Sequence, residues 1–67
     1  MGYKIGDRIK VIAENGDTPH RIPIGAYATI SKIYEVNDYP IQLKEFTDCL
    51  AENEIRWALK GEETLAI

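Results

Sequence analysis

Cysteine is almost absent from this chain, which limits how its fold can be held together. The 67 residues include one cysteine, Cys49, and one histidine, His20. A single cysteine cannot form an internal disulfide, and it cannot supply the paired cysteines of a structural zinc site. Because so few nitrogen and sulfur ligands are present, we expect neither a metal nor a cofactor. Stability has to come from packing.

Long apolar segments are also missing. The longest uninterrupted apolar runs have two or three residues, such as residues 11–13, whereas a helix that crosses a membrane needs about 20. Residues 1–4 lack the apolar stretch of a signal peptide. We therefore expect a cytoplasmic protein, in the host cytoplasm if the chain is viral, with no membrane partner.

Positive charge is not in excess either. Eight Lys and Arg residues stand against eleven Asp and Glu residues, for a net charge of −3 at pH 7. This balance opposes the basic footprint of a protein that neutralises many phosphates. Residues 1–24 are the more basic part and residues 45–63 the more acidic part. They could form two separate faces or neutralise each other across paired strands, and the frequency of opposite charges across strands favours the second arrangement.

The composition that remains is that of a small globular domain, with 45% hydrophobic and 28% charged residues. A chain of this length buries only about 60% of its unfolded surface. Few apolar residues are then left to line a substrate pocket of roughly 300 Å³, which disfavours an enzyme. We expect one domain over residues 1–60 and a short frayed C-terminal tail over residues 61–67.

The first strand is indicated by alternation of apolar and polar side chains. Ile9 and Val11 share one face, and Arg8 and Lys10 share the other, as in a strand that is buried on one side. Ile12 breaks the alternation, so it either packs against the tail or lies exposed.

A loop and a bent strand follow. Residues 18–25 contain two prolines and a glycine, which favours a loop, and loops held by a rigid sheet often carry binding residues. Alternation resumes over residues 26–30, but Ile33 has the wrong parity to share the face of Ile30. This slip predicts a β-bulge near Ser31 and Lys32.

The second half is read as three short strands. Residues 36–40 resemble a hairpin turn, and Ile41 and Leu43 then face inward. Residues 46–59 have apolar spacing close to helical. A lone helix would leave exposed sheet edges, so we favour a strand at 49–51, a 3₁₀ turn at 52–54 and a closing strand at 55–59.

Three segments carry a resemblance to a known family. Residues 3–12, 24–30 and 50–57 resemble the first strand, the second strand and the final strand, 3₁₀ turn and closing strand of SH3-like barrels of the KOW type, which include many small phage and prophage proteins. The resemblance covers about residues 3–59. It implies a mostly β fold, a five-stranded SH3-like small barrel with a short 3₁₀ turn before the last strand. Members include peptide-binding modules, nucleic-acid modules and phage proteins that act on host machinery.

Catalytic residues are not indicated. Ser31 or Cys49 could pair with His20, but both fall in predicted strands and nothing places His20 beside them. We expect His20 to be an exposed loop residue and Cys49 a buried one. Glu52 and Glu54 are expected to be solvated surface charges.

The aromatic residues are too numerous for so small a core. Tyr27 and Tyr34 face away from the apolar side of their strand, so they either form an exposed patch beside the proline-containing loop or cover the open ends of the barrel. Trp57 and Phe46 are the largest apolar side chains, and we expect them in the core.

These observations favour a non-enzymatic binding module of phage or prophage origin that contacts a host or viral protein. The predicted partner-binding residues are Tyr27, Tyr34, His20, Arg21 and Ile22. The alternative is a nucleic-acid-binding KOW-like barrel with stacking tyrosines, whose basic residues would be Lys4, Arg8, Lys10, Arg21 and Lys32. A second alternative is a structural or oligomer-forming subunit that pairs an edge strand between chains.

Overall fold

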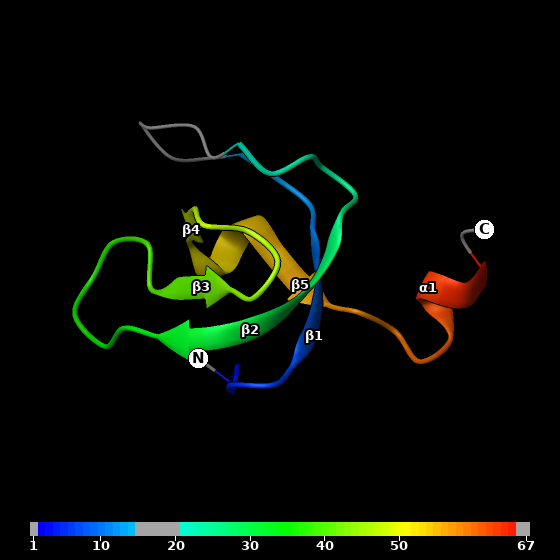
Figure 1. The fold of residues 1–67 in the computed structure, drawn as a ribbon, viewed down its shortest axis with the longest axis horizontal. Helices are drawn as coiled ribbons and strands as arrows, with labels where there is room; N and C mark the ends of the chain where they lie inside the picture. The colour runs from blue at the N-terminus through cyan, green and yellow to red at the C-terminus, as the bar shows by residue number, and fades with distance from the viewer. Residues whose placement is uncertain (1, 15–20, 66–67) are drawn as a thin grey trace.

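A single five-stranded antiparallel sheet organises the chain. The computed structural model describes residues 2–14 and 21–65. Within them the strand order is β4-β3-β2-β1-β5 (Figure 1). The strands are β1 (Arg8–Val11), β2 (Tyr27–Ile33), β3 (Ile41–Leu43), β4 (Cys49–Leu50) and β5 (Ile55–Trp57), with the 3₁₀ turn η1 (Glu52–Glu54) before β5 and the helix α1 (Glu62–Leu65) at the end. The predicted mostly β fold is confirmed.

Strand β1 has the predicted two faces. Ile9 and Val11 are fully buried, and Arg8 and Lys10 lie on the opposite, outward side. Ile12, which breaks the alternation, is 42% exposed. Of the two positions considered for Ile12, the structure therefore has the exposed one.

Strand β2 is shared by both parts of the sheet. It pairs with β1 through Tyr27 and the residues up to Thr29, and with β3 through Ile30 to Ile33, with a register shift between Ile30 and Lys32. A bulge adds one residue to a strand and so reverses the side on which the following side chains point. Ile33 thereby returns to the core side and packs against it. The predicted bulge is confirmed.

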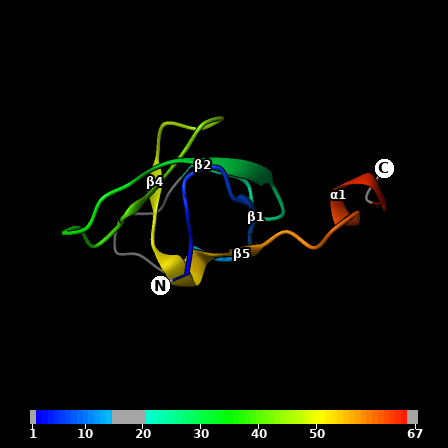
Figure 2. The same cartoon turned by 90° about the horizontal axis from the view of Figure 1, so that it is seen from below.

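The ambiguous segment after residue 46 forms β4, η1 and β5 rather than one helix. Figure 2 shows the sheet curling, with β2 on one side and η1 and β5 on the other. Strands β4 and β5 are the two edges of the sheet, and within the described residues no pairing joins them. The sheet is therefore strongly bent but open.

The core consists of aliphatic side chains from every strand and from the segment before β2. Its buried members are Ile9, Val11, Ile22, Ala28, Ile30, Ile41, Leu43, Leu50 and Ile55. Phe46 packs against this cluster from a partly buried position. Trp57, in contrast, is 49% exposed, so its predicted place in the core is wrong. It shares the inward parity of Ile55, but it is the last residue of an edge strand, where little of the sheet is left to cover it.

Glu54 is a buried acid, only 1% exposed, so its predicted role as a solvated surface charge is wrong. Its side-chain Oε1 accepts a hydrogen bond from the Ala51 N–H at 2.8 Å, and its own N–H donates to the Ala51 carbonyl at 3.0 Å. Its carbonyl accepts the N–H of Ile12 at 2.9 Å. Because buried polar groups are costly when unpaired, these bonds explain why the carboxylate is tolerated, and they fix η1 against the end of β1.

The segment after β5, where a frayed tail was predicted, includes the helix α1. After β5, the Ala58 N–H donates to the Arg8 carbonyl at 3.0 Å. Gly61 then adopts a φ of 81°, a left-handed conformation that favours glycine, and α1 follows. Figures 1 and 2 show α1 set apart from the sheet at the end of an extended segment, so side chains rather than backbone hold it in place.

Candidate functional site

The two tyrosines of the predicted patch lie at opposite ends of β2. Tyr27 is its first residue and Tyr34 follows its last, a separation of roughly 20 Å at about 3.3 Å per residue. The Tyr34 hydroxyl donates to Gln42 Oε1 at 2.7 Å, and Lys32 Nζ lies 4.9 Å from the Tyr34 ring centroid. The two tyrosines therefore do not form one surface.

Arg21 and Ile22, two other predicted residues, line a small hollow. The hollow has a volume of about 100 Å³ and is lined by Arg21, Ile22, Phe46, Thr47 and Asp48. This volume is well below the roughly 300 Å³ of an ordinary ligand pocket. The Arg21 N–H donates to Asp48 Oδ2 at 2.7 Å and so ties the loop to the segment before β4.

The predicted partner-binding set also includes Ile22 and His20. Ile22 is only 3% exposed and belongs to the core, so its predicted presentation to a partner is wrong. The reason is that burying an isoleucine side chain is worth about 1.5–3 kcal/mol, and a core this small uses it. His20 lies outside the described residues.

A row of polar side chains crosses the outward side of β1, β2 and β5. Lys10 is directly opposite Tyr27 on one neighbouring strand and directly opposite Arg56 on the other. Lys10 Nζ lies 5.6 Å from the centroid of the Tyr27 ring, and Arg8 lies two residues before Lys10 on the same face. We call these four residues, Arg8, Lys10, Tyr27 and Arg56, the arginine face.

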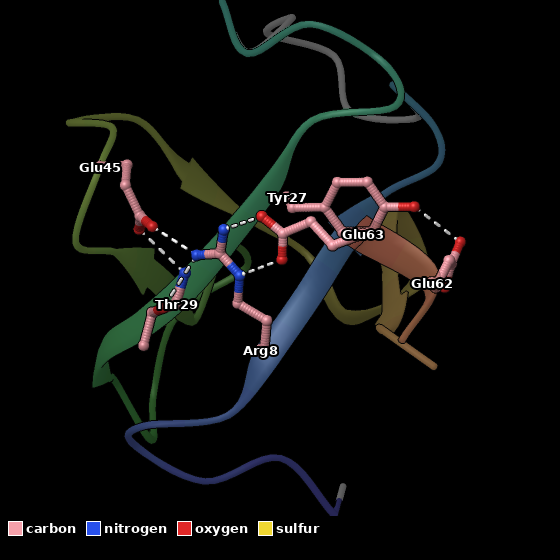
Figure 3. Close-up of polar contacts among 6 residues, drawn as sticks. All are labelled: Arg8, Tyr27, Thr29, Glu45, Glu62 and Glu63. Carbon is pink, nitrogen blue, oxygen red and sulfur yellow. Dashed lines mark hydrogen bonds and ion pairs between the residues drawn. The ribbon is translucent and has the colours of Figure 1, made fainter. Parts of the chain in front are cut away.

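The carboxylate of Glu62, in α1, lies on the arginine face and accepts several hydrogen bonds. Arg56 binds it with both terminal nitrogens, Nη1 to Oε1 at 2.9 Å and Nη2 to Oε2 at 2.5 Å. The Tyr27 hydroxyl donates to Oε2 at 2.8 Å (Figure 3), and Lys10 Nζ lies 3.6 Å from the same oxygen. The Leu59 N–H donates to Oε1 at 2.9 Å. Glu62 therefore links all three strands to the C-terminal turn.

The next residue, Glu63, binds the guanidinium of Arg8. Arg8 donates through Nε to Glu63 Oε1 at 2.9 Å and through Nη2 to Oε2. Its third nitrogen, Nη1, donates to Glu45 Oε2 at 2.6 Å and to Thr29 Oγ1 at 3.0 Å, and the Thr29 N–H donates to Glu45 Oε1 at 2.9 Å. Figure 3 shows Arg8 between the two carboxylates. The basic and acidic parts of the chain do neutralise each other here, but two of the three acids come from α1 and not from a paired strand.

These contacts shift the pKa values of the groups involved. Hydrogen bonds from Arg56, then from the Leu59 N–H and Tyr27, hold the pKa of Glu62 far below its usual range. The bonds from Arg8 likewise lower the pKa of Glu63. The same contacts raise the pKa of both arginines, through Glu63 and then Glu45 for Arg8 and through Glu62 for Arg56. All four groups are therefore charged at neutral pH.

A second surface is formed by the ring pair of Tyr3 and Trp57, which we call the aromatic pair. The two ring centroids are 4.4 Å apart with an interplanar angle of 32°. The indole Nε1 of Trp57 donates to Asp7 Oδ2 at 3.1 Å, which lowers the pKa of Asp7. The Tyr3 hydroxyl donates to the Ile55 carbonyl at 3.2 Å. Trp57 is thus held on two sides while half of it stays exposed.

Sequence reasoning missed both features for identifiable reasons. The alternation of side chains along β5 places Trp57 on the inward side. It does not show how much of the ring is covered by other side chains. The closing strand was predicted to run to residue 59, so the end of β5 at Trp57 was not indicated. The charges at Glu62 and Glu63 were visible in the sequence, but their partner strands were not.

Comparison of the chain with protein families, with curated proteins and with solved structures finds no match. Within residues 2–14 and 21–65, no three His, Cys, Asp or Glu side chains are grouped so that they could hold a metal ion. In the same ranges, no helix has the length and apolar character needed to cross a membrane. Function is therefore inferred from the arginine face and the aromatic pair.

Proposed function

We propose that this chain is a non-enzymatic binding module of the SH3-like type and that its partner is a protein. The strand order, the bulge in β2 and the 3₁₀ turn before β5 support the SH3-like arrangement. Protein binding is supported by the aromatic pair, which offers a fixed apolar surface. The partner segment that suits this surface is apolar.

The observation that carries this proposal is the state of Trp57. It is the chain's single tryptophan, it is 49% exposed, and its orientation is already set by Tyr3 and Asp7. Tryptophan is among the residues that contribute most to protein interfaces, and a side chain ordered before binding loses less entropy on binding. Ile5 and Leu59, two residues from Tyr3 and Trp57 along the chain, are 67% and 68% exposed.

The remaining side chains favour binding over chemistry. The Ser31 hydroxyl donates to the Gln42 carbonyl at 3.2 Å, so it is engaged as a donor to the backbone. Cys49 is a partly buried thiol in an edge strand. A nucleophilic enzyme needs such a group beside a base and a site for the substrate, and the hollow near Arg21 is small for that purpose.

Nucleic acid is less well supported as the partner. Arg8 and Arg56 each already bind a carboxylate, and nucleic-acid binding relies on cations that are free to neutralise phosphates. A protein partner at the aromatic pair requires no such exchange.

The test is capture of partners from the native cell by the full chain, followed by mass spectrometry. We expect Trp57→Ala to lose the captured protein while its circular dichroism spectrum is retained. Val36→Ala is the matched control because Val36 is 96% exposed and lies in the β2–β3 connection. Addition of the purified partner should also move the Trp57 emission to shorter wavelengths, since its ring becomes buried. Equal capture by Trp57→Ala and the unaltered chain would refute the proposed surface.

A further inference from the structure

We propose that the arginine face is a binding site for an acidic peptide segment with two adjacent carboxylates, and that α1 occupies this site in the free protein. The site is separate from the aromatic pair. Arg56 and Trp57 are consecutive in β5, and consecutive side chains of a strand point to opposite faces. The chain would then have two surfaces for contact with proteins.

The geometry of the two guanidinium groups carries the proposal. Arg56 binds one carboxylate through two nitrogens, and Arg8 binds the next through two nitrogens. Glu62 and Glu63, which they bind, are neighbours in sequence. Two-bonded arginine–carboxylate pairs fix orientation as well as charge, so two of them side by side select a ligand with two adjacent acids.

The other two residues of the arginine face, Lys10 and Tyr27, also contact the carboxylate of Glu62. Lys10 lies 3.6 Å from the Glu62 carboxylate, and the Tyr27 hydroxyl donates to it at 2.8 Å. Glu62 is less exposed than the other two acids that the arginines bind, with 18% of its side chain accessible against 46% for Glu63 and 37% for Glu45. A ligand would therefore make its main contact at the position now held by Glu62 and a second contact beside Arg8.

The contact of α1 is of a kind that a ligand can displace. Four residues are too few for a helix to form without support, and the ion pair of Glu63, whose side chain is 46% exposed, contributes little to stability. The connection to β5 passes through Gly61, whose backbone is in the left-handed region. A longer acidic segment with additional contacts can thus replace Glu62 and Glu63 without disturbing the sheet.

The small number of positions in the site favours a short acidic peptide over a nucleic acid. Glu45 lies at the edge of the arginine face, 2.6 Å from Arg8 Nη1, where it would repel a continuous phosphate backbone. A short acidic segment needs only the two positions that Glu62 and Glu63 occupy.

The test uses the full chain with the double substitution Glu62→Gln and Glu63→Gln, which frees the arginine face. The probe is a synthetic peptide of residues 58–67, blocked at both ends, and its matched form has Gln in place of both Glu residues. Binding is followed by the amide shifts of Lys10 and Tyr27 in NMR titrations. We expect the peptide to bind the double variant at least about tenfold more tightly than the unaltered chain, because an occupied site lowers apparent affinity. The Gln form should bind at least about tenfold more weakly.

Substitutions in the face itself provide the control. Adding Arg8→Gln and Arg56→Gln to the double variant should abolish the shifts. Adding Lys4→Gln and Lys44→Gln, which remove the same charge from exposed lysines outside the arginine face, should retain them. The Gln peptide alters the ligand alone, so it keeps the test valid if an arginine variant does not fold.

Several results would overturn the proposal. The first two are absence of peptide binding to the double variant and equal binding of the Gln peptide. The third is tighter binding of a ten-nucleotide single strand at the same salt concentration. The fourth is sedimentation of the unaltered chain as a dimer, which would assign the arginine face to the tail of a second copy. Trp57→Ala should leave peptide binding unchanged. A failure here can therefore be distinguished from a failure of the aromatic pair.

Discussion

Glu62 and Leu59 bind each other reciprocally at the start of the C-terminal helix. The Leu59 N–H donates to Glu62 Oε1 at 2.9 Å, and the Glu62 N–H donates to the Leu59 carbonyl at 2.9 Å. The same carboxylate binds Arg56 on β5. One side chain therefore shapes the turn before α1 and also attaches it to the sheet.

Replacement of Glu62 by Gln should release α1, because the neutral amide loses the charge that holds Arg56 and Lys10. We expect amide exchange at Leu59 to accelerate by roughly tenfold. Glu63→Gln should have a smaller effect, since Glu63 binds one arginine and makes no bond to the turn among the described contacts. Equal acceleration in the two variants would contradict the leading role of Glu62.

The attachment of α1 to the sheet should weaken as the pH falls. The pKa values of Glu62 and Glu63 are lowered in the folded chain, so the contacts are fully present above the ordinary carboxyl pKa of about 4.3. They are lost as the pH falls below that value towards the lowered folded pKa. NMR signals of residues 58–63 should stay constant from pH 7 to about 5 and change below about 4. A change centred near pH 6 would point to a different group.

Gly61→Ala tests the backbone at the hinge. An added Cβ meets no atom within 4 Å, so any effect comes from the left-handed φ of 81°, which costs an alanine about 1–2 kcal/mol. We expect faster amide exchange over residues 59–62 and an unchanged melting temperature of the sheet. Lys60→Ala, one residue earlier, is the control and should leave exchange unaltered.

Glu54→Ala should destabilise the whole domain. The substitution leaves the part-buried Ala51 N–H without its side-chain acceptor and removes the buried side chain of Glu54, which costs about 1–3 kcal/mol. Urea unfolding followed by Trp57 emission measures this loss. Glu35→Ala removes an exposed acid from the β2–β3 connection and should change stability by less than about 0.5 kcal/mol. Similar losses in both variants would show that overall charge, not the buried contact, is responsible.

Local periodicity was sufficient to predict most of the sheet. The faces of β1 follow from alternation at Ile9 and Val11, and the bulge in β2 follows from the parity slip between Ile30 and Ile33. Both are properties of a few consecutive residues. The segment that includes η1 was ambiguous by spacing. The argument about exposed edges led to the correct order of strand, 3₁₀ turn and strand, but among the described residues no pairing of β4 with β5 closes the sheet.

Features that depend on distant partners were not predictable in the same way. The carbonyl of Glu54 accepts the N–H of Ile12 from the end of β1, and α1 is bound through Glu63 by Arg8, which lies 55 residues earlier in the chain. Tyr27 was selected as a binding residue, and it does lie on the arginine face. Tyr34 and Arg21 lie elsewhere, since parity alone does not report lateral position in a sheet. Phage or prophage origin stays a prediction of the family resemblance.

The shortness of the outermost strands has a consequence for behaviour in concentrated solution. β4 has two residues and β5 has three, so each border of the sheet offers a neighbouring molecule only a brief run of backbone. Fibril growth by strand addition requires longer, flat borders. These short borders give strand addition by a second molecule little backbone to extend.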